Sequence, residues 1–171
     1  MNTNNLKRFA QEARRKLLQQ VSAKLEQVLH TDSPELREKT GQLRNLREAI
    51  NATSKEQVID KVAYTWFNRL MALRFMDAND YQPIGVRVIT PKDSYTLPEI
   101  LDEAKQGQIP DELPVKVQHI YDLLDGRINA TNAQNEAYKE LLIGACNHLN
   151  KVFHFCLSAS MIMPSCSCPR T

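Results

Sequence analysis

Cysteines and histidines are the side chains of this 171-residue chain whose types could bind a metal. Three of its four cysteines lie in residues 156–171, CLSASMIMPSCSCPRT. Structural zinc sites use CxxC pairs, whereas Cys166 and Cys168 are spaced CxC and have no second pair. Cys146 and His148 are two apart on a predicted helix and so point to different sides. The histidines are scattered over different predicted elements (residues 30, 119, 148 and 154). The sequence therefore predicts no metal site.

Phosphate-binding and catalytic loops are the second kind of chemistry to test. A nucleotide-binding loop needs closely spaced glycines, so that backbone amides can approach the anion. The five glycines are widely separated (residues 41, 85, 107, 126 and 144). An enzyme that methylates the amino group of adenine needs an Asn/Asp-Pro-Pro-Tyr/Phe type of motif to hold the flipped base. No two prolines are adjacent. We therefore expect no catalytic and no cofactor-binding residue in this chain.

A basic cluster near the start of the chain is the remaining candidate site. The stretch NLKRFAQEARRKLLQQ sets five cations against one acid, Glu12. The cations are Lys7, Arg8, Arg14, Arg15 and Lys16. Residues 1–50 as a whole hold ten Lys/Arg and six Asp/Glu, although the chain carries a net charge of only +2. Such a cluster could contact the phosphate backbone of DNA. The alternative interpretation is a solvated helix face without a partner.

Composition indicates a cytoplasmic protein. No stretch approaches the roughly 20 apolar residues of a membrane helix, and the polar start MNTNN has no signal-peptide core. In the cytoplasm thiols stay reduced, so the cysteines need not form disulfides. Glycine is scarce, which favours helices over tight turns. We expect a mostly α protein without a membrane partner.

Helical periodicity positions these residues. Apolar residues recur every three or four positions from Leu6 to Val28 and predict a long first helix. A second helix is predicted over 36–50, and the short connection at HTDSPEL makes 1–50 an antiparallel helical hairpin. A third helix is predicted over 54–76, with Thr53 and Glu56 at capping-box spacing. Its apolar band includes Trp66 and Phe75 and is so wide that we expect this helix at the centre of the domain.

The second half of the chain is also predicted to be helical. GVRVIT alternates at Val86 and Val88 between prolines, which indicates at most one short extended segment near 86–89. Further helices are predicted within 97–155, one beginning at about Leu97, one ended by Gly126 and a last one capped near Asn132. The fold class is therefore all-α, with a multi-helix domain over 1–155.

The segments quoted next resemble one known family. NLKRFAQEARRKLLQQV, SKEQVIDKVAYTWFNRLMALRFMDAN, TLPEILDEAKQGQIPDELP and NEAYKELLIGACNHLNKVF are similar to the opening part of the adenine-specific DNA methyltransferases of type 1 BREX phage-defence systems, the PglX family. The resemblance covers about residues 1–155. It implies a much longer parent, in which a Rossmann-like domain binds S-adenosylmethionine and methylates adenine N6 of DNA. It also implies DNA and, through the parent, other BREX components as partners.

The resemblance stops near Phe155, which suggests an origin for the cysteine-rich end. Read two nucleotides later, the codons of Met161 to Pro169 permit Asp-Tyr-Ala-Glu-Leu-Leu-Leu-Pro, a string closer to the style of the rest. Our hypothesis is a frameshift that leaves 156–171 as a non-homologous, disordered tail. The chain would then be a truncated, inactive N-terminal domain, since neither the cofactor loop nor the catalytic motif is in it. The alternative is a free-standing helical interaction or dimerisation module.

Overall fold

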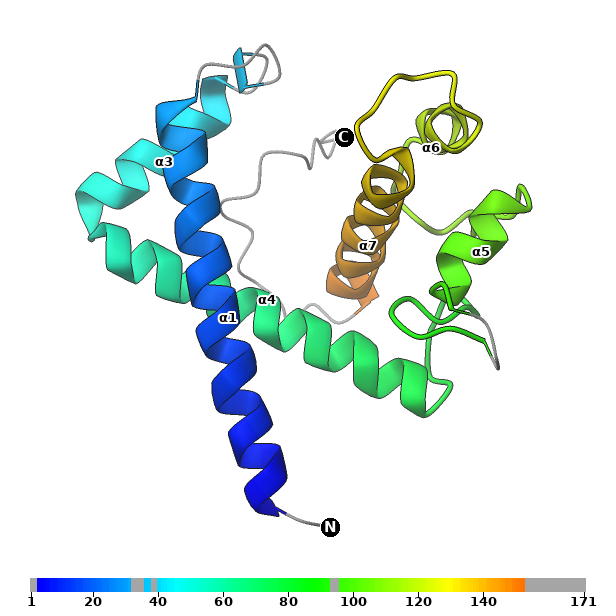
Figure 1. Cartoon of the computed structure of the whole chain (residues 1–171), viewed down its shortest axis with the longest axis horizontal. Helices are drawn as coiled ribbons and strands as arrows, with labels where there is room; N and C mark the ends of the chain where they lie inside the picture. The colour runs from blue at the N-terminus through cyan, green and yellow to red at the C-terminus, as the bar shows by residue number, and fades with distance from the viewer. Residues whose placement is uncertain (1–2, 32–35, 38–39, 93–95, 153–171) are drawn as a thin grey trace. The chain divides into compact units, whose positions relative to one another are not determined.

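The part of the chain that the structure describes contains six α-helices, in line with the amphipathic periodicity of the sequence. The structure, a computed structural model, describes residues 3–31, 36–37, 40–92 and 96–152. The helices are α1 (Thr3–His30), α3 (Thr40–Ala52), α4 (Lys55–Ala78), α5 (Glu99–Lys105), α6 (Val117–Leu124) and α7 (Ala133–Val152) (Figure 1). No strand occurs among these described residues, so the all-α prediction is confirmed. The predicted tail, 156–171, lies outside them.

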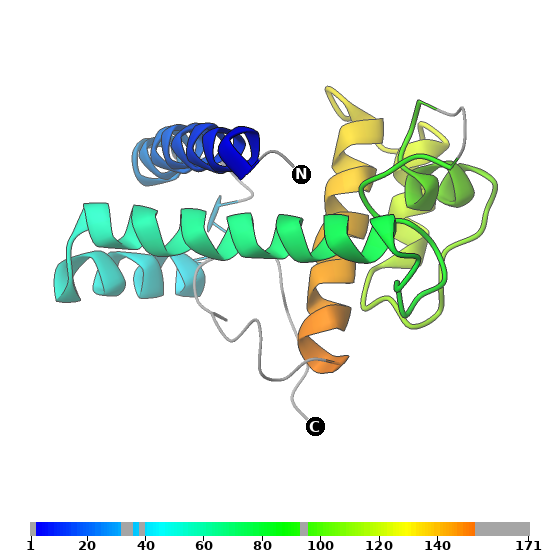
Figure 2. The ribbon, with the colours of Figure 1, turned by 90° about the horizontal axis from the view of Figure 1, so that it is seen from below.

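The described part of the chain divides into two units, one up to Asn68 and the other beginning at Arg69. In the first unit α1 lies in a layer of its own over α3 and the beginning of α4 (Figure 2). Its core is Leu25 of α1, Leu46 of α3 and Val58 of α4, all at most 8% exposed. Partly buried apolar residues surround these three: Val28, Leu29, Ala49, Ile50, Ile59 and Val62.

The second unit contains the end of α4, the two short helices α5 and α6, and the longer α7. Helix α7 packs against α5 and α6, which also contact each other. Leu73, Val88, Ile100, Ile120 and Leu141 are completely buried in its core. Gly144 of α7 allows a close approach here, since a methyl group at that position would overlap Val115. These buried side chains form the apolar core of the second unit.

Local signals define most helix boundaries. The predicted cap of the last helix is confirmed, because the side chain of Asn132 accepts the backbone N–H of Asn135 at 3.0 Å. Gly126 also ends α6 as predicted, with a φ of 72°. The predicted capping box at Thr53 is wrong by one residue. Ser54 caps α4 and accepts the N–H of Gln57 at 3.2 Å, whereas the Thr53 hydroxyl donates back to Ala49 of α3 at 2.9 Å.

Helix α4 departs from its predicted burial. Trp66, expected at the centre of the core, is only half-buried, and Phe75 is 61% exposed. Leu73 and Met76 are buried as predicted. At about 100° per residue, Phe75 lies roughly 160° around the helix from Leu73. The wide apolar band of the sequence is therefore two faces, of which one faces the core.

Candidate nucleic-acid interface

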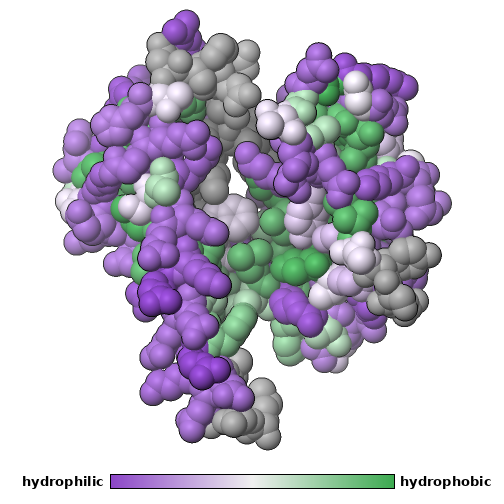
Figure 3. All heavy atoms as spheres, viewed as in Figure 1, coloured by the Kyte–Doolittle hydropathy of each residue, from purple (hydrophilic) through white to green (hydrophobic). Residues whose placement is uncertain are grey.

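All five predicted basic residues lie on α1 and are exposed: Lys7, Arg8, Arg14, Arg15 and Lys16. The face of α1 turned to the viewer in Figure 3 is mostly hydrophilic. No described side chain of α1 before Leu25 is buried. The basic half of the helix is therefore accessible over its whole length, as a phosphate-binding surface must be.

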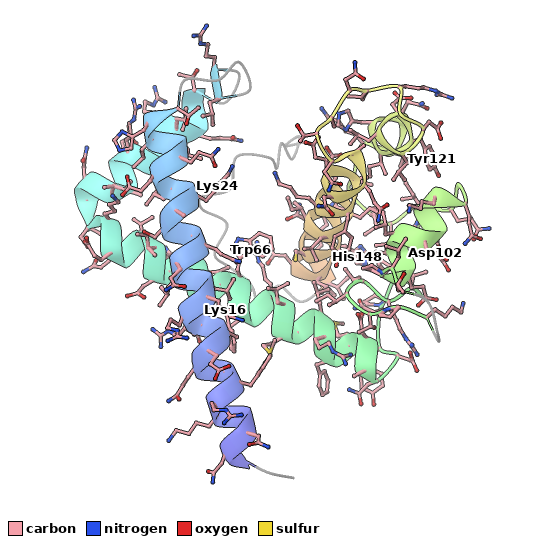
Figure 4. All side chains as sticks on the ribbon, in the orientation of Figure 1. Lys16, Lys24, Trp66, Asp102, Tyr121 and His148 are labelled. Carbon is pink, nitrogen blue, oxygen red and sulfur yellow. The ribbon has the colours of Figure 1, made fainter. Side chains whose placement is uncertain are left out.

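The five cations do not form one stripe. Residues seven apart lie within about 20° of each other on a helix, so Lys7 aligns with Arg14 and Arg8 aligns with Arg15. The two ridges are about 100° apart, and Lys16 lies about another 90° beyond the second. Lys16 projects from the middle of α1 in Figure 4. A flat nucleic-acid backbone can meet one ridge and its flank but not all five side chains together.

The two ridges differ in whether they face another helix. Arg14 lies 3.9 Å from Asp60 of α4, on the side of α1 that faces its own unit. Arg8 lies 3.9 Å from Glu12, one turn away on the same helix. Both contacts are long and exposed, and such ion pairs contribute little to the stability of the fold. Arg15 and Lys16 form no ion pair within the described residues. The ridge of Arg8 and Arg15, with Lys16 on its flank, is thus the part of the cluster most available to phosphate.

A shallow depression of about 540 Å³ lies where α1 meets α4. Ser22, one of its lining residues, is seven positions after Arg15 and so lies on the same face of α1. Its floor includes Leu18 and Ile59, and its rim includes Glu56 and Asp60. Hydrogen bonds from its own backbone N–H and from Ser54 hold the pKa of Glu56 below its usual value. Glu56 is therefore an anion at neutral pH. This acidic edge disfavours phosphate beside the depression, so the candidate interface is the Arg8–Arg15 part of this face, which precedes the depression in the chain.

A second polar arrangement, which the sequence did not predict, surrounds the buried carboxylate of Asp77. Asp77 is 1% exposed and lies near the end of α4. Its oxygens accept the backbone N–H groups of Val88 at 3.0 Å, Ile89 at 2.8 Å and Thr90 at 2.9 Å. The Thr90 hydroxyl and the Gln82 amide also donate to it. One carboxylate therefore accepts three successive backbone N–H groups of the segment predicted to be extended near 86–89, and Val86 and Val88 are buried.

Electrostatics make Asp77 a structural anion and not a proton-transfer group. Burial on its own would raise the pKa of Asp77. The hydrogen bonds from Val88, Ile89, Gln82 and Thr90 together outweigh burial and hold the pKa below its usual value. The hydroxyl of Tyr138 on α7 donates to the Val88 carbonyl at 3.2 Å. Burial is the main cause that raises the pKa of Tyr138, and the negative charge of Asp77 adds to it. Both groups keep their ordinary protonation states at neutral pH.

Beside Asp77, a cavity of about 260 Å³ is lined by paired charges. The Arg87 guanidinium donates twice to Asp80, at 2.8 and 3.0 Å, and the Lys92 ammonium lies 3.2 Å from Glu99. The other oxygen of Glu99 accepts the backbone N–H of Arg87 at 3.1 Å. Each charge in the cavity therefore has a partner of the opposite sign, and this arrangement stabilises the loop without leaving a general base or a nucleophile.

Histidine and cysteine side chains do not gather in the described part of the chain. His119 of α6 lies 3.0 Å from Glu140 of α7, and Nδ1 of His148 is 3.1 Å from the Glu112 carbonyl oxygen. Figure 4 labels His148 on α7, together with Asp102 on α5 and Tyr121 on α6. Cys146 is buried. The described residues contain no group of three His, Cys, Asp or Glu that could hold a metal ion. Cys166 and Cys168, whose CxC spacing predicts no zinc site, lie outside the described residues.

Sequence comparisons place the chain among known proteins. Adenine-specific methyltransferase PglX from Lacticaseibacillus casei (strain Zhang) is 31% identical to it in an alignment 142 positions long that covers 66% of this chain. Adenine-specific methyltransferase BrxX from Escherichia coli O9:H4 (strain HS) is 30% identical in an alignment 184 positions long, gaps included, that covers 93% of this chain. The chain is a distant relative of PglX and BrxX. The resemblance inferred from the sequence is therefore confirmed.

The relationship to PglX and BrxX is partial in length. This chain spans 12% of the PglX protein and 15% of the BrxX protein. No family profile matches the chain. No solved structure matches it either. None of the described helices is long and apolar enough to cross a membrane.

Proposed function

We propose that this chain is a truncated N-terminal helical segment of an adenine-specific DNA methyltransferase of a BREX phage-defence system. The observation that carries the proposal is the match to BrxX, which covers 93% of this chain but only 15% of the relative. The parent enzyme is cytoplasmic and transfers a methyl group from S-adenosylmethionine to adenine N6. DNA and other BREX components are its partners.

The described residues do not fit S-adenosylmethionine. A Rossmann-type cofactor site needs a strand followed by a glycine-rich turn and a helix. Here Gly85, Gly107 and Gly126 have positive φ but stand singly in separate turns, and the last two close helices α5 and α6. No residue of this chain is therefore assigned to the cofactor, and we expect the chain alone to be inactive.

The exposed ridge of α1 supports a role in holding DNA. Arg8 and Arg15 are about 10 Å apart along the helix axis, so they can contact different phosphates of one strand. Such contacts position a protein on DNA without reading its sequence. The segment would then add non-specific affinity to an enzyme whose base recognition and chemistry lie in other domains.

The alternative function is a free-standing helical interaction or dimerisation module. The uncovered first half of α1 favours it, since isolated helices of this length are marginal in water without a packing partner. The two functions differ in what the neighbouring DNA must encode. Only a methyltransferase segment requires a cofactor loop and an Asn-Pro-Pro-Tyr type of motif in the same gene.

Sequencing the gene through and beyond codon 155 tests the proposal. We expect an open frame, shifted relative to codons 156–171, that encodes the cofactor loop and the catalytic motif. A following sequence with neither feature in any frame would contradict the methyltransferase proposal and favour the interaction module. Calorimetry on the purified chain should show no S-adenosylmethionine binding, whereas micromolar binding would contradict the assignment of catalysis to other domains.

A further inference from the structure

The end of α4 carries an exposed apolar surface in the second unit. Phe75 is 61% exposed and Tyr81 is 64% exposed, and their rings meet edge to face with centroids 6.2 Å apart. Met71 and Ala78 lie one turn before and after Phe75 on the same face of the helix. We call Met71, Arg74, Phe75, Ala78 and Tyr81 the aromatic surface.

Local structure explains why the two rings touch but not why they are exposed. The N–H of Tyr81 donates to the Met76 carbonyl at 2.9 Å and the N–H of Asp80 donates to the Asp77 carbonyl at 3.4 Å, which is a Schellman helix end. An apolar contact across the end of the helix often accompanies this motif. A pair of smaller apolar side chains would serve that purpose, so two large rings, each more than half exposed, indicate a further role.

The composition of the aromatic surface indicates a protein partner. Phenylalanine, tyrosine, methionine and arginine are the residue types enriched at the centres of protein interfaces. Arg74 is exposed and forms no ion pair within the described residues. The nearby pair of Asp80 and Arg87 adds a polar edge. The carboxylate of Asp80 also makes this surface unfavourable for phosphate, in contrast to the basic ridge of α1.

We propose that the aromatic surface docks the remaining, catalytic part of the parent methyltransferase, through an apolar pocket with a carboxylate that meets Arg74. This inference rests on the proposed function. Its support is length, because the chain spans 15% of BrxX, and a segment of a much larger protein needs surfaces that pack against the rest. The two apolar faces of α4 fit this arrangement, with Leu73 and Met76 in the core and Phe75 on the docking side.

A binding experiment in trans tests the proposal. The purified full chain is titrated by calorimetry into E. coli BrxX from which the matched segment has been deleted. The variant Phe75→Ser/Tyr81→Ser should weaken binding roughly 100-fold, because aromatic anchors dominate interface affinity. Arg74→Glu should weaken it roughly 10-fold. The matched control is Phe9→Ser, which removes an aromatic side chain that is 53% exposed on α1 and should leave binding unchanged.

Three results would overturn the proposal. They are no binding by the wild-type chain, binding by the double variant within twofold of wild type, and an equal loss from Phe9→Ser. Sedimentation of the chain alone tests whether a second copy of this chain occupies the aromatic surface instead. A dimer that the double variant converts to a monomer would assign the surface to a second copy of this chain. The sequence of the gene beyond codon 155 is independent of these results, so the proposed function can stand if the docking surface fails.

Discussion

The carboxylate of Asp77 and the backbone N–H of Val88 are 3.0 Å apart, although eleven positions separate the two residues in the chain. This contact, with those to Ile89 and Thr90, fastens the loop after α4 to the end of that helix. The neighbouring Val88 side chain is completely buried. Asp77 therefore couples the position of the loop to the apolar core of the second unit.

Replacing Asp77 by Ala should be among the most destabilising single changes in the chain. It would leave three backbone N–H groups of a partly buried loop without an acceptor, each at a cost of about 1–3 kcal/mol. We expect a loss of at least about 3 kcal/mol in the free energy of unfolding, measured by urea denaturation. Asp111→Ala is the control, because Asp111 is an exposed carboxylate outside the network. Similar losses in the free energy of unfolding for the two variants would show that the hydrogen bonds to Asp77 contribute little to stability.

The pH dependence of stability should reveal Asp77 and Glu103 through opposite signs. The lowered pKa of folded Asp77 means that its contribution is present above the unfolded value of about 3.9 and is lost as pH falls through the folded pKa. Burial, and then the charge of Glu99, raise the pKa of Glu103, so ionised Glu103 opposes folding at neutral pH. Glu103→Gln should therefore raise the melting temperature at pH 7 and lose this advantage below about pH 4.

Asp77→Asn should have the opposite effect. It should lower the melting temperature strongly at pH 7, and by less as the pH falls below about 4. Thermal melts from pH 3 to pH 7 measure both variants against wild type. Differences that stay constant over this range would show that neither carboxyl titrates differently in the folded and unfolded chain.

Three helices of the second unit end in the same Schellman motif, but they differ in the residue with positive φ. The residue with positive φ is Gly107 after α5 and Gly126 after α6, whereas after α4 it is Asp80, with a φ of 53°. A methyl group at Gly107 or Gly126 would meet no atom within 4 Å. Gly126→Ala should therefore cost about 1 kcal/mol through backbone strain alone.

Asp80→Gly should be within about 0.5 kcal/mol of wild type, because relief of the left-handed backbone offsets loss of the exposed Arg87 pair. Asp80→Ala keeps the strain, loses the pair and should cost about 1 kcal/mol. Urea denaturation of the three variants measures these values. A cost for Asp80→Gly as large as that for Asp80→Ala would mean that the Arg87 pair, and not the backbone, decides stability here.

These features show what the sequence could predict and what it could not. Helix periodicity, Gly126 and the Asn132 cap depend on residues within a few positions of each other, and they were predicted correctly. The Asp77 network joins residues on either side of a turn, and nothing in the letters of MDAND distinguishes a buried aspartate from an exposed one. Phe75 was placed in the core because apolarity alone cannot separate the two faces of α4. The ion pair of Arg14 with Asp60 likewise required the packing of two helices.

Gly144 gives a test of packing in the second unit. Gly to Ala inside a helix normally stabilises by about 1 kcal/mol. Here the new methyl group would overlap Cγ1 of Val115, so Gly144→Ala should instead destabilise by about 1–3 kcal/mol. The double variant Gly144→Ala/Val115→Ala should recover part of the loss made by the single changes. Additive losses in this double-mutant cycle would mean that the two residues do not touch.

Duplex binding by α1 is the last prediction, and charge reversal can locate it. If Arg8 and Arg15 contact phosphates, Arg8→Glu/Arg15→Glu should nearly abolish a weak, sequence-independent binding of the chain to DNA. The slope of log K against log salt should fall by about 2, since each phosphate contact contributes about 0.9. Lys24→Glu/Lys61→Glu is the matched control, because it makes the same change in net charge at two exposed positions of the same unit. Fluorescence anisotropy with a labelled duplex at several salt concentrations measures both. Equal losses in the two variants would mean that only the net charge of the unit matters, and the ridge on α1 would no longer be a candidate interface.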